Sequence, residues 1–107
     1  MVTVEIQGPG VPSTRELRVG DELILRLPEN PTTGFRWQVN PSADPALRRV
    51  DDRFEPGSGS PLPGAGGTRV FKFAASSAGT VQLSLAHRQE WEPTRGTEHR
   101  LVVVIRA

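Results

Sequence analysis

The sequence contains no cysteine, no tyrosine, and only two histidines, His87 and His99. The lack of cysteine excludes disulfide bonds, thiolate metal sites and a cysteine nucleophile. The two histidines belong to no nucleophile motif and lack the close His-x-x-x-His spacing of many metal sites. We therefore expect no metal or other cofactor, and an enzyme is the least favoured of the classes of protein considered.

Neither sign of charge predominates, and no long apolar run is present. Thirteen Lys and Arg against twelve Asp and Glu give a formal net charge of +1, which argues against nucleic acid or an anionic membrane as a partner. No apolar stretch approaches the roughly 20 residues that span a bilayer. Because no signal-like segment precedes the first strand, the sequence fits a cytoplasmic protein or a mature domain whose leader was removed. We expect a monomer.

What the sequence does contain is strand-like alternation of apolar and polar residues. A chain of 107 residues suits one domain, residues 1–107. Alternation predicts strands at residues 2–6, 22–27, 35–39, 68–74 and 80–86. The aliphatic stretch 101–105 indicates a central strand buried on both faces. With turn residues between them, about seven strands predict an all-β, immunoglobulin-like β-sandwich.

Three other stretches are less regular. Residues 46–54 could form a helical turn capped at Asp44-Pro45, but we favour a strand over 50–54, with the mixed charges of 48–53 on a solvated face. Residues 55–67 are dense in Pro, Gly and Ser, which indicates a functional or mobile loop. We expect a charged loop at 87–97. Phe35 or Phe73 should lie in the core, because both occupy alternating apolar positions.

A short polar segment lies between the second and third of these predicted strands, and its residues are Asn30, Pro31, Thr32, Thr33 and Gly34. Proline fixes one φ angle, asparagine can bond its own backbone, and glycine permits positive φ, so the segment should be a stiff turn. On composition alone it reads as an ordinary connection, since most loops only connect. Phe35 and Trp37 follow it at once and anchor it in a strand.

A glycine-rich segment occupies the end of the long loop, and it comprises Leu62, Pro63, Gly64, Ala65, Gly66 and Gly67. Without Cβ atoms, such a backbone lets another chain lie alongside and form main-chain hydrogen bonds. A flexible connection is the simpler alternative. A phosphate-binding loop is disfavoured, because the Lys-Ser/Thr that should follow is missing and no helix begins here.

A tryptophan stands in the third segment, where Trp91 lies between Glu90 and Glu92 and follows Arg88. Charged neighbours make this a poor place for a core residue, and an exposed tryptophan in a loop is a typical interface anchor. The alternative is that Trp91 folds back onto its own sandwich.

Taken in order, these segments resemble the three signature loops of the chagasin family, protein inhibitors of papain-like cysteine proteases. Asn-Pro-Thr-Thr-Gly-Phe followed by Trp resembles the first signature, Gly64 to Gly67 the second, and Trp91 the third. The final stretch 97–104 also looks like the family's last strand. One departure concerns the third signature: the family has Arg-Pro-Trp where this chain has Gln89-Glu90-Trp91, so whether Arg88 takes the role of the family arginine stays open.

The resemblance implies a reversible inhibitor, not an enzyme, that plugs a papain-like protease with a three-loop wedge. Residues 30–34 would cover the catalytic cysteine and histidine, with Thr32 nearest. Leu62 or Pro63 would enter a subsite, residues 64–67 would lie along the unprimed side of the cleft, and Trp91 would pack on the primed side. The alternative from a different class is an immunoglobulin-like binding module for another protein or a glycan.

Overall fold

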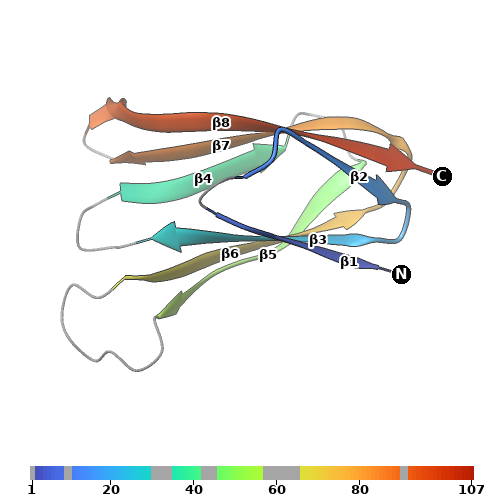
Figure 1. Ribbon diagram of the computed structural model, residues 1–107, viewed down its shortest axis with the longest axis horizontal. Coiled ribbons are helices and arrows are strands. Elements are labelled where there is room, and N and C mark those ends of the chain that lie inside the picture. The colour runs from blue at the N-terminus through green and yellow to red at the C-terminus, as the bar shows by residue number, and fades with distance from the viewer. Residues whose placement is uncertain (1, 9–10, 30–34, 42–45, 57–65, 90–91) are drawn as a thin grey trace.

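The computed structural model describes residues 2–8, 11–29, 35–41, 46–56, 66–89 and 92–107. These residues form strands and turns without a helix, as the alternating pattern predicts (Figure 1). The described residues form eight strands: β1 (Thr3–Gln7), β2 (Thr14–Arg18), β3 (Glu22–Glu29), β4 (Phe35–Pro41), β5 (Leu47–Pro56), β6 (Gly67–Ala75), β7 (Gly79–Gln89) and β8 (Glu92–Arg106).

The strands form two four-stranded sheets, with the orders β1-β3-β6-β5 and β2-β8-β7-β4. The first two strands join different sheets, where β1 runs parallel to β3 and β2 runs parallel to β8. All other neighbours are antiparallel. Figure 1 shows the two sheets as facing layers. The prediction of an immunoglobulin-like β-sandwich is confirmed, with eight strands in place of about seven.

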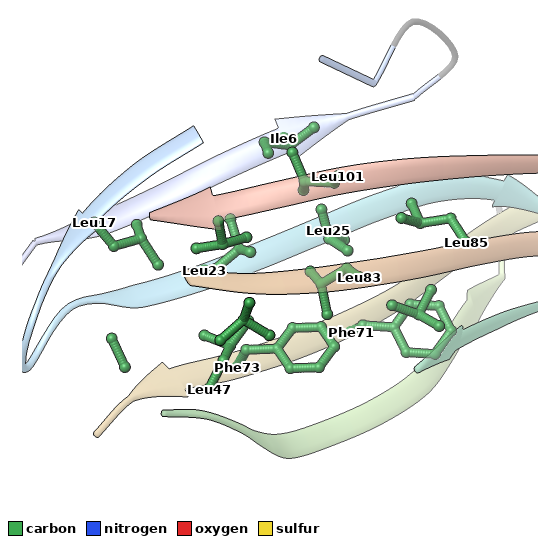
Figure 2. Close-up of a cluster of buried hydrophobic side chains, with 14 of the residues drawn as sticks. Ile6, Leu17, Leu23, Leu25, Leu47, Phe71, Phe73, Leu83, Leu85 and Leu101 are labelled. Atoms are coloured by element: carbon green, nitrogen blue, oxygen red, sulfur yellow. The ribbon is translucent and has the colours of Figure 1, made fainter. Parts of the chain in front are cut away.

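The core lies between the two layers and follows the period of two. Along β3, Leu23, Leu25 and Leu27 are fully buried, whereas Glu22 and Arg26 on the other face are partly exposed. Phe71 and Phe73 from β6 pack with leucines of both sheets (Figure 2). Each buried Leu or Phe contributes about 1.5–3 kcal/mol to folding relative to an exposed one, so strand alternation accounts for much of the stability.

The structure settles one of the less regular stretches and adds one strand that the sequence did not predict. The strand favoured over 50–54 is confirmed and is longer than expected, because β5 spans Leu47–Pro56. An irregularity between Arg49 and Asp51 lets Val50 point outward, where it is 48% exposed. A strand also forms at Thr14–Arg18, outside the strands predicted from the sequence.

Two predictions about the end of the chain are wrong. Residues 87–97 are mostly paired rather than a loop: β7 continues to Gln89, β8 begins at Glu92, and His87 pairs with Thr97. β8 is central in its sheet but is buried on one face only, since Leu101, Val103 and Ile105 are enclosed while the valines between them stay partly exposed. Pairing with a neighbouring strand satisfies a charged strand's backbone, so charge at 87–97 did not indicate a loop.

Candidate functional site

Three pairs of strands end or begin together at one end of the sandwich. β3, β5 and β7 end there and β4, β6 and β8 begin there, while β1 starts and β8 finishes at the opposite end (Figure 1). The register aligns these termini within each sheet, Gly67 with Glu29 and Pro56, and Gln89 with Phe35 and Glu92. We call these six residues the loop end. All three motif-bearing connections therefore join strand ends at the same end of the sandwich.

Most residues of the three motifs lie outside the described residues. These are Asn30, Pro31, Thr32, Thr33, Gly34, Leu62, Pro63, Gly64, Ala65 and Trp91. Gly66, Gly67 and Arg88 are described and can be compared with the expectation. Gly66 and Gly67 differ in their exposure to solvent.

Gly67 has a role within the sandwich itself. It is the half-buried first residue of β6, whereas Gly66 is exposed. A Cβ atom at Gly67 would collide with the carbonyl oxygen of Glu55 and lie 2.6 Å from the Phe54 ring. Close packing of β5 on β6 therefore requires glycine at position 67. Gly66 is exposed, and its contact with another chain stays a prediction.

Arg88 lies near the end of β7 and is bonded within its own sheet. Its Nη2 donates a hydrogen bond to Glu98 Oε2 at 2.7 Å, and its side chain is 38% exposed. The guanidinium is thus oriented by β8 and still reaches solvent. An exposed pair of this kind stabilises the fold by less than about 1 kcal/mol, so Glu98 holds the Arg88 side chain only weakly.

Glu29 is a residue of the loop end that the sequence analysis missed. It is only 5% exposed. Its Oε2 accepts a hydrogen bond from the backbone N–H of Trp37 at 2.9 Å, and its Oε1 lies 3.5 Å from Arg69 Nη1. A buried carboxylate needs such partners, because leaving water otherwise costs several kcal/mol. The signal was present in the alternation 23, 25, 27, 29, which places position 29 on the inward face.

Trp37 fixes the start of β4 in two further ways. Its indole Nε1 donates to the carbonyl oxygen of Pro28 at 2.7 Å, and its ring stacks on His87 at 4.5 Å with an interplanar angle of 7°. Phe35 tilts against the same imidazole at 5.3 Å. Phe35 is half-buried and lies outside the core cluster, so of the two phenylalanines only Phe73 is a core residue.

The imidazole of His87 contacts both of these aromatic rings. Burial lowers the pKa of His87 below its ordinary value of 6.5, because a charged imidazolium loses hydration there, and the negative charge of Glu29 offsets part of the effect. Among the atoms that the structure describes, His87 Nε2 is buried and has no hydrogen-bond partner. Beside it, Phe35, Gly96 and Thr97 line an apolar depression of about 340 Å³.

His99, the second histidine, lies in β8. His99 is a half-buried strand residue whose Nε2 lies 3.1 Å from the carbonyl oxygen of Pro12. The described part of the chain has no cluster of three or more His, Asp or Glu side chains that could hold a metal ion. The same residues include no helix long and apolar enough to cross a membrane.

Comparison with known proteins identifies a class of peptidase inhibitor built on this sandwich. The model of the chagasin family peptidase inhibitors, I42, matches residues 16–105. Chagasin from Trypanosoma cruzi is 31% identical over 99 residues, which is 89% of each chain. The chain therefore belongs to the chagasin family, which is a family of inhibitors and not of enzymes.

Three solved structures share this fold, and one of them is a cysteine protease inhibitor. The cysteine protease inhibitor EhICP2 from Entamoeba histolytica aligns with a TM-score of 0.84 at 20% identity, covering 98% of this chain and 96% of that one. Amebosin aligns with a TM-score of 0.77 at 22% identity, covering 96% and 97%. PbICP-C, solved in complex with falcipain-2, aligns with a TM-score of 0.62 at 16% identity, covering 96% and 98%.

Proposed function

We propose that this protein is a reversible inhibitor of papain-like cysteine proteases and that it covers the active-site cleft with the three segments leaving the loop end. The observation that carries the proposal is the alignment of six strand termini at one end of a chagasin-family sandwich. Of the similar structures, one is a cysteine protease inhibitor and another was solved in complex with falcipain-2.

In this proposal each segment has its own place on the protease. Residues 30–34 cover the catalytic cysteine and histidine, with Thr32 nearest. The segment from Leu62 to Gly66 lies along the unprimed side of the cleft, with Leu62 or Pro63 entering a subsite, while Gly67 supports the segment from within β6. Trp91 packs on the primed side, and Arg88 is the candidate for the role of the family arginine.

Inhibition of this kind requires no chemistry from the inhibitor. The chain has no cysteine with which to form a mixed disulfide, and the catalytic groups of the protease only have to be covered. Affinity then depends on complementary surfaces and on how little ordering the segments need upon binding. Pro31 should stiffen the first segment, which leads directly into β4, so its contacts should be converted into affinity most efficiently.

The test is titration of the purified protein into papain and a cathepsin while substrate hydrolysis is followed. We expect Thr32→Arg to weaken inhibition most, about a hundredfold or more, because it places bulk and charge over the catalytic pair. Trp91→Ala should come next, at about thirtyfold, as for an interface hot spot. Inserting two serines into the glycine segment should matter least.

Thermal melts of each variant provide the control for folding. If Thr32→Arg has the same inhibition constant as the parent, the three-loop wedge is wrong. Failure of the folded parent to inhibit any papain-like enzyme would leave a binding module for another protein or a glycan as the better account.

A further inference from the structure

The carboxylate of Glu29 connects the two sheets at the loop end. Glu29 is the last residue of β3, in one sheet, and its Oε2 accepts from the N–H of Trp37 in β4, in the other sheet, at 2.9 Å. β4 is an edge strand, paired on one side with β7. An edge strand has backbone donors that no neighbouring strand satisfies. Here a buried side chain from the facing sheet satisfies one of them.

A second hydrogen bond joins the same two strands, and we call the contacts of Pro28 and Glu29 with Trp37 the clamp. Trp37 donates its indole N–H back to the carbonyl oxygen of Pro28, so Trp37 is bonded to two consecutive residues of β3. Glu29 Oε1 also faces Arg69 Nη1 in β6, and Arg69 is held in turn by Asp52 at 2.6 Å. The end of β3 and the start of β4, which flank residues 30–34, are therefore fixed against each other.

The alternation of β3 does not by itself call for a carboxylate at this position. β3 continues a series of buried leucines, and an apolar residue at position 29 would extend it, but it would leave the Trp37 N–H without its acceptor and Arg69 without one of its two carboxylate partners. The carboxylate supplies a directional hydrogen-bond acceptor. It accepts one backbone N–H at a defined place, and this sets the distance between the ends of β3 and β4.

We propose that Glu29 is a positioning residue for inhibition: its carboxylate fixes β3 and β4 at the spacing at which the loop end fits a protease cleft. The inference rests on the proposed function and goes beyond it, because Glu29 is buried and acts through Trp37. Removing the carboxylate should weaken inhibition in a protein that remains folded.

The opposite end of the sandwich supplies a matched control. Asp21 is also buried, and it accepts backbone hydrogen bonds from Val2 at 3.0 Å and from Arg18 at 2.9 Å. These two residues adjoin β1 and end β2, which belong to different sheets. Asp21 therefore ties the sheets together as Glu29 does, but far from the loop end.

The experiment compares Glu29→Leu and Glu29→Gln with Asp21→Ala and Asp21→Asn. Thermal melts are recorded first, and inhibition of papain is measured well below the lowest melting temperature. We expect Glu29→Leu to raise the inhibition constant at least about tenfold, the value of one hydrogen bond to a charged group. Glu29→Gln keeps one oxygen for the Trp37 N–H and should recover part of that loss. Both Asp21 variants should inhibit as the parent does.

A second measurement separates this inference from the proposed function. Amide hydrogen exchange should become faster at Phe35 to Trp37 in Glu29→Leu and stay unchanged there in Asp21→Ala. If the parent inhibits papain and Glu29→Leu inhibits equally well, the inference is wrong while the proposed function stands. Equal weakening by Asp21→Ala would also overturn it, because a general loss of stability would then be the cause. If the parent does not inhibit papain, the proposed function fails. In that case, unchanged amide exchange at Trp37 in Glu29→Leu would separately refute the clamp.

Discussion

Phe73 and Phe35 both follow the alternating pattern, yet their surroundings differ. Phe73 is completely buried between leucines of the core, whereas Phe35 stands at the loop end against His87. The inward face of a strand is buried only where the facing sheet covers it, and near Phe35 the facing strand β3 ends in Glu29. The same pattern of residues therefore gives a core residue at one position and a partly exposed ring at the other.

We expect Phe73→Ala to lower the free energy of unfolding by about 3–5 kcal/mol, the cost of a large core cavity. Phe35→Ala should cost about 1 kcal/mol, because only part of its surface is removed from water. Urea denaturation gives both values, and similar slopes with denaturant would show that the unfolding reaction is unchanged. Equal losses for the two variants would contradict the distinction between them.

Gly66 and Gly67 illustrate how one motif divides between a strand and the connection before it. Gly67 opens β6 and lies where a Cβ would meet the backbone of β5, whereas Gly66 is exposed beside it. The glycine at 67 therefore belongs to the pairing of β5 with β6. The glycine at 66 remains available to a partner.

Adjacent substitutions test this division. Gly67→Ala should destabilise the domain by about 2 kcal/mol, as in other overpacked sites, and lower the melting temperature by roughly 10 °C. Gly66→Ala should change stability by no more than about 0.5 kcal/mol, as is usual for exposed positions. Differential scanning calorimetry of both variants measures the contrast, and a stable Gly67→Ala protein would show that β5 and β6 can separate at little cost.

The stability of the whole domain should depend on pH through His87. The groups facing its ring are Trp37 and Phe35 from β4, with the charge of Glu29 from β3. Because the pKa of His87 is lower in the folded protein, the unfolded chain binds this proton more readily. The contribution of neutral His87 is thus fully present above about pH 6.5 and is lost as the pH falls through the lower, folded-state value.

Urea unfolding at several values between pH 7.5 and 4.5 measures this dependence. His87→Phe keeps a ring against Trp37 and removes the titrating group, so we expect a smaller loss of stability on acidification than in the parent. His99 is common to both proteins and cancels in the comparison. Parallel stability curves would mean that His87 takes up its proton as easily in the folded state as in the unfolded state.

Most strands could be predicted from the sequence, because the period of two is a local property of each segment. The limits came from pairing between distant segments. The charges of 87–97 suggested a loop, yet β7 and β8 pair across this stretch and satisfy its backbone. Similarly, Val102 and Val104 suggested burial on both faces of β8, but only one face meets the other sheet.

The motifs and their order were legible in the sequence, since each is a contiguous set of turn, glycine or aromatic residues whose chemistry depends on its neighbours in the chain. Their convergence at the loop end depends on strand direction and sheet order, and only the folded chain fixes these. The same is true of Glu29, whose contact with Arg69 spans 40 residues of sequence. Judged only by its neighbours in the sequence, a charged residue next to a turn is expected to be solvated. In the folded chain the facing sheet buries Glu29, and a buried carboxylate depends on its hydrogen bonds.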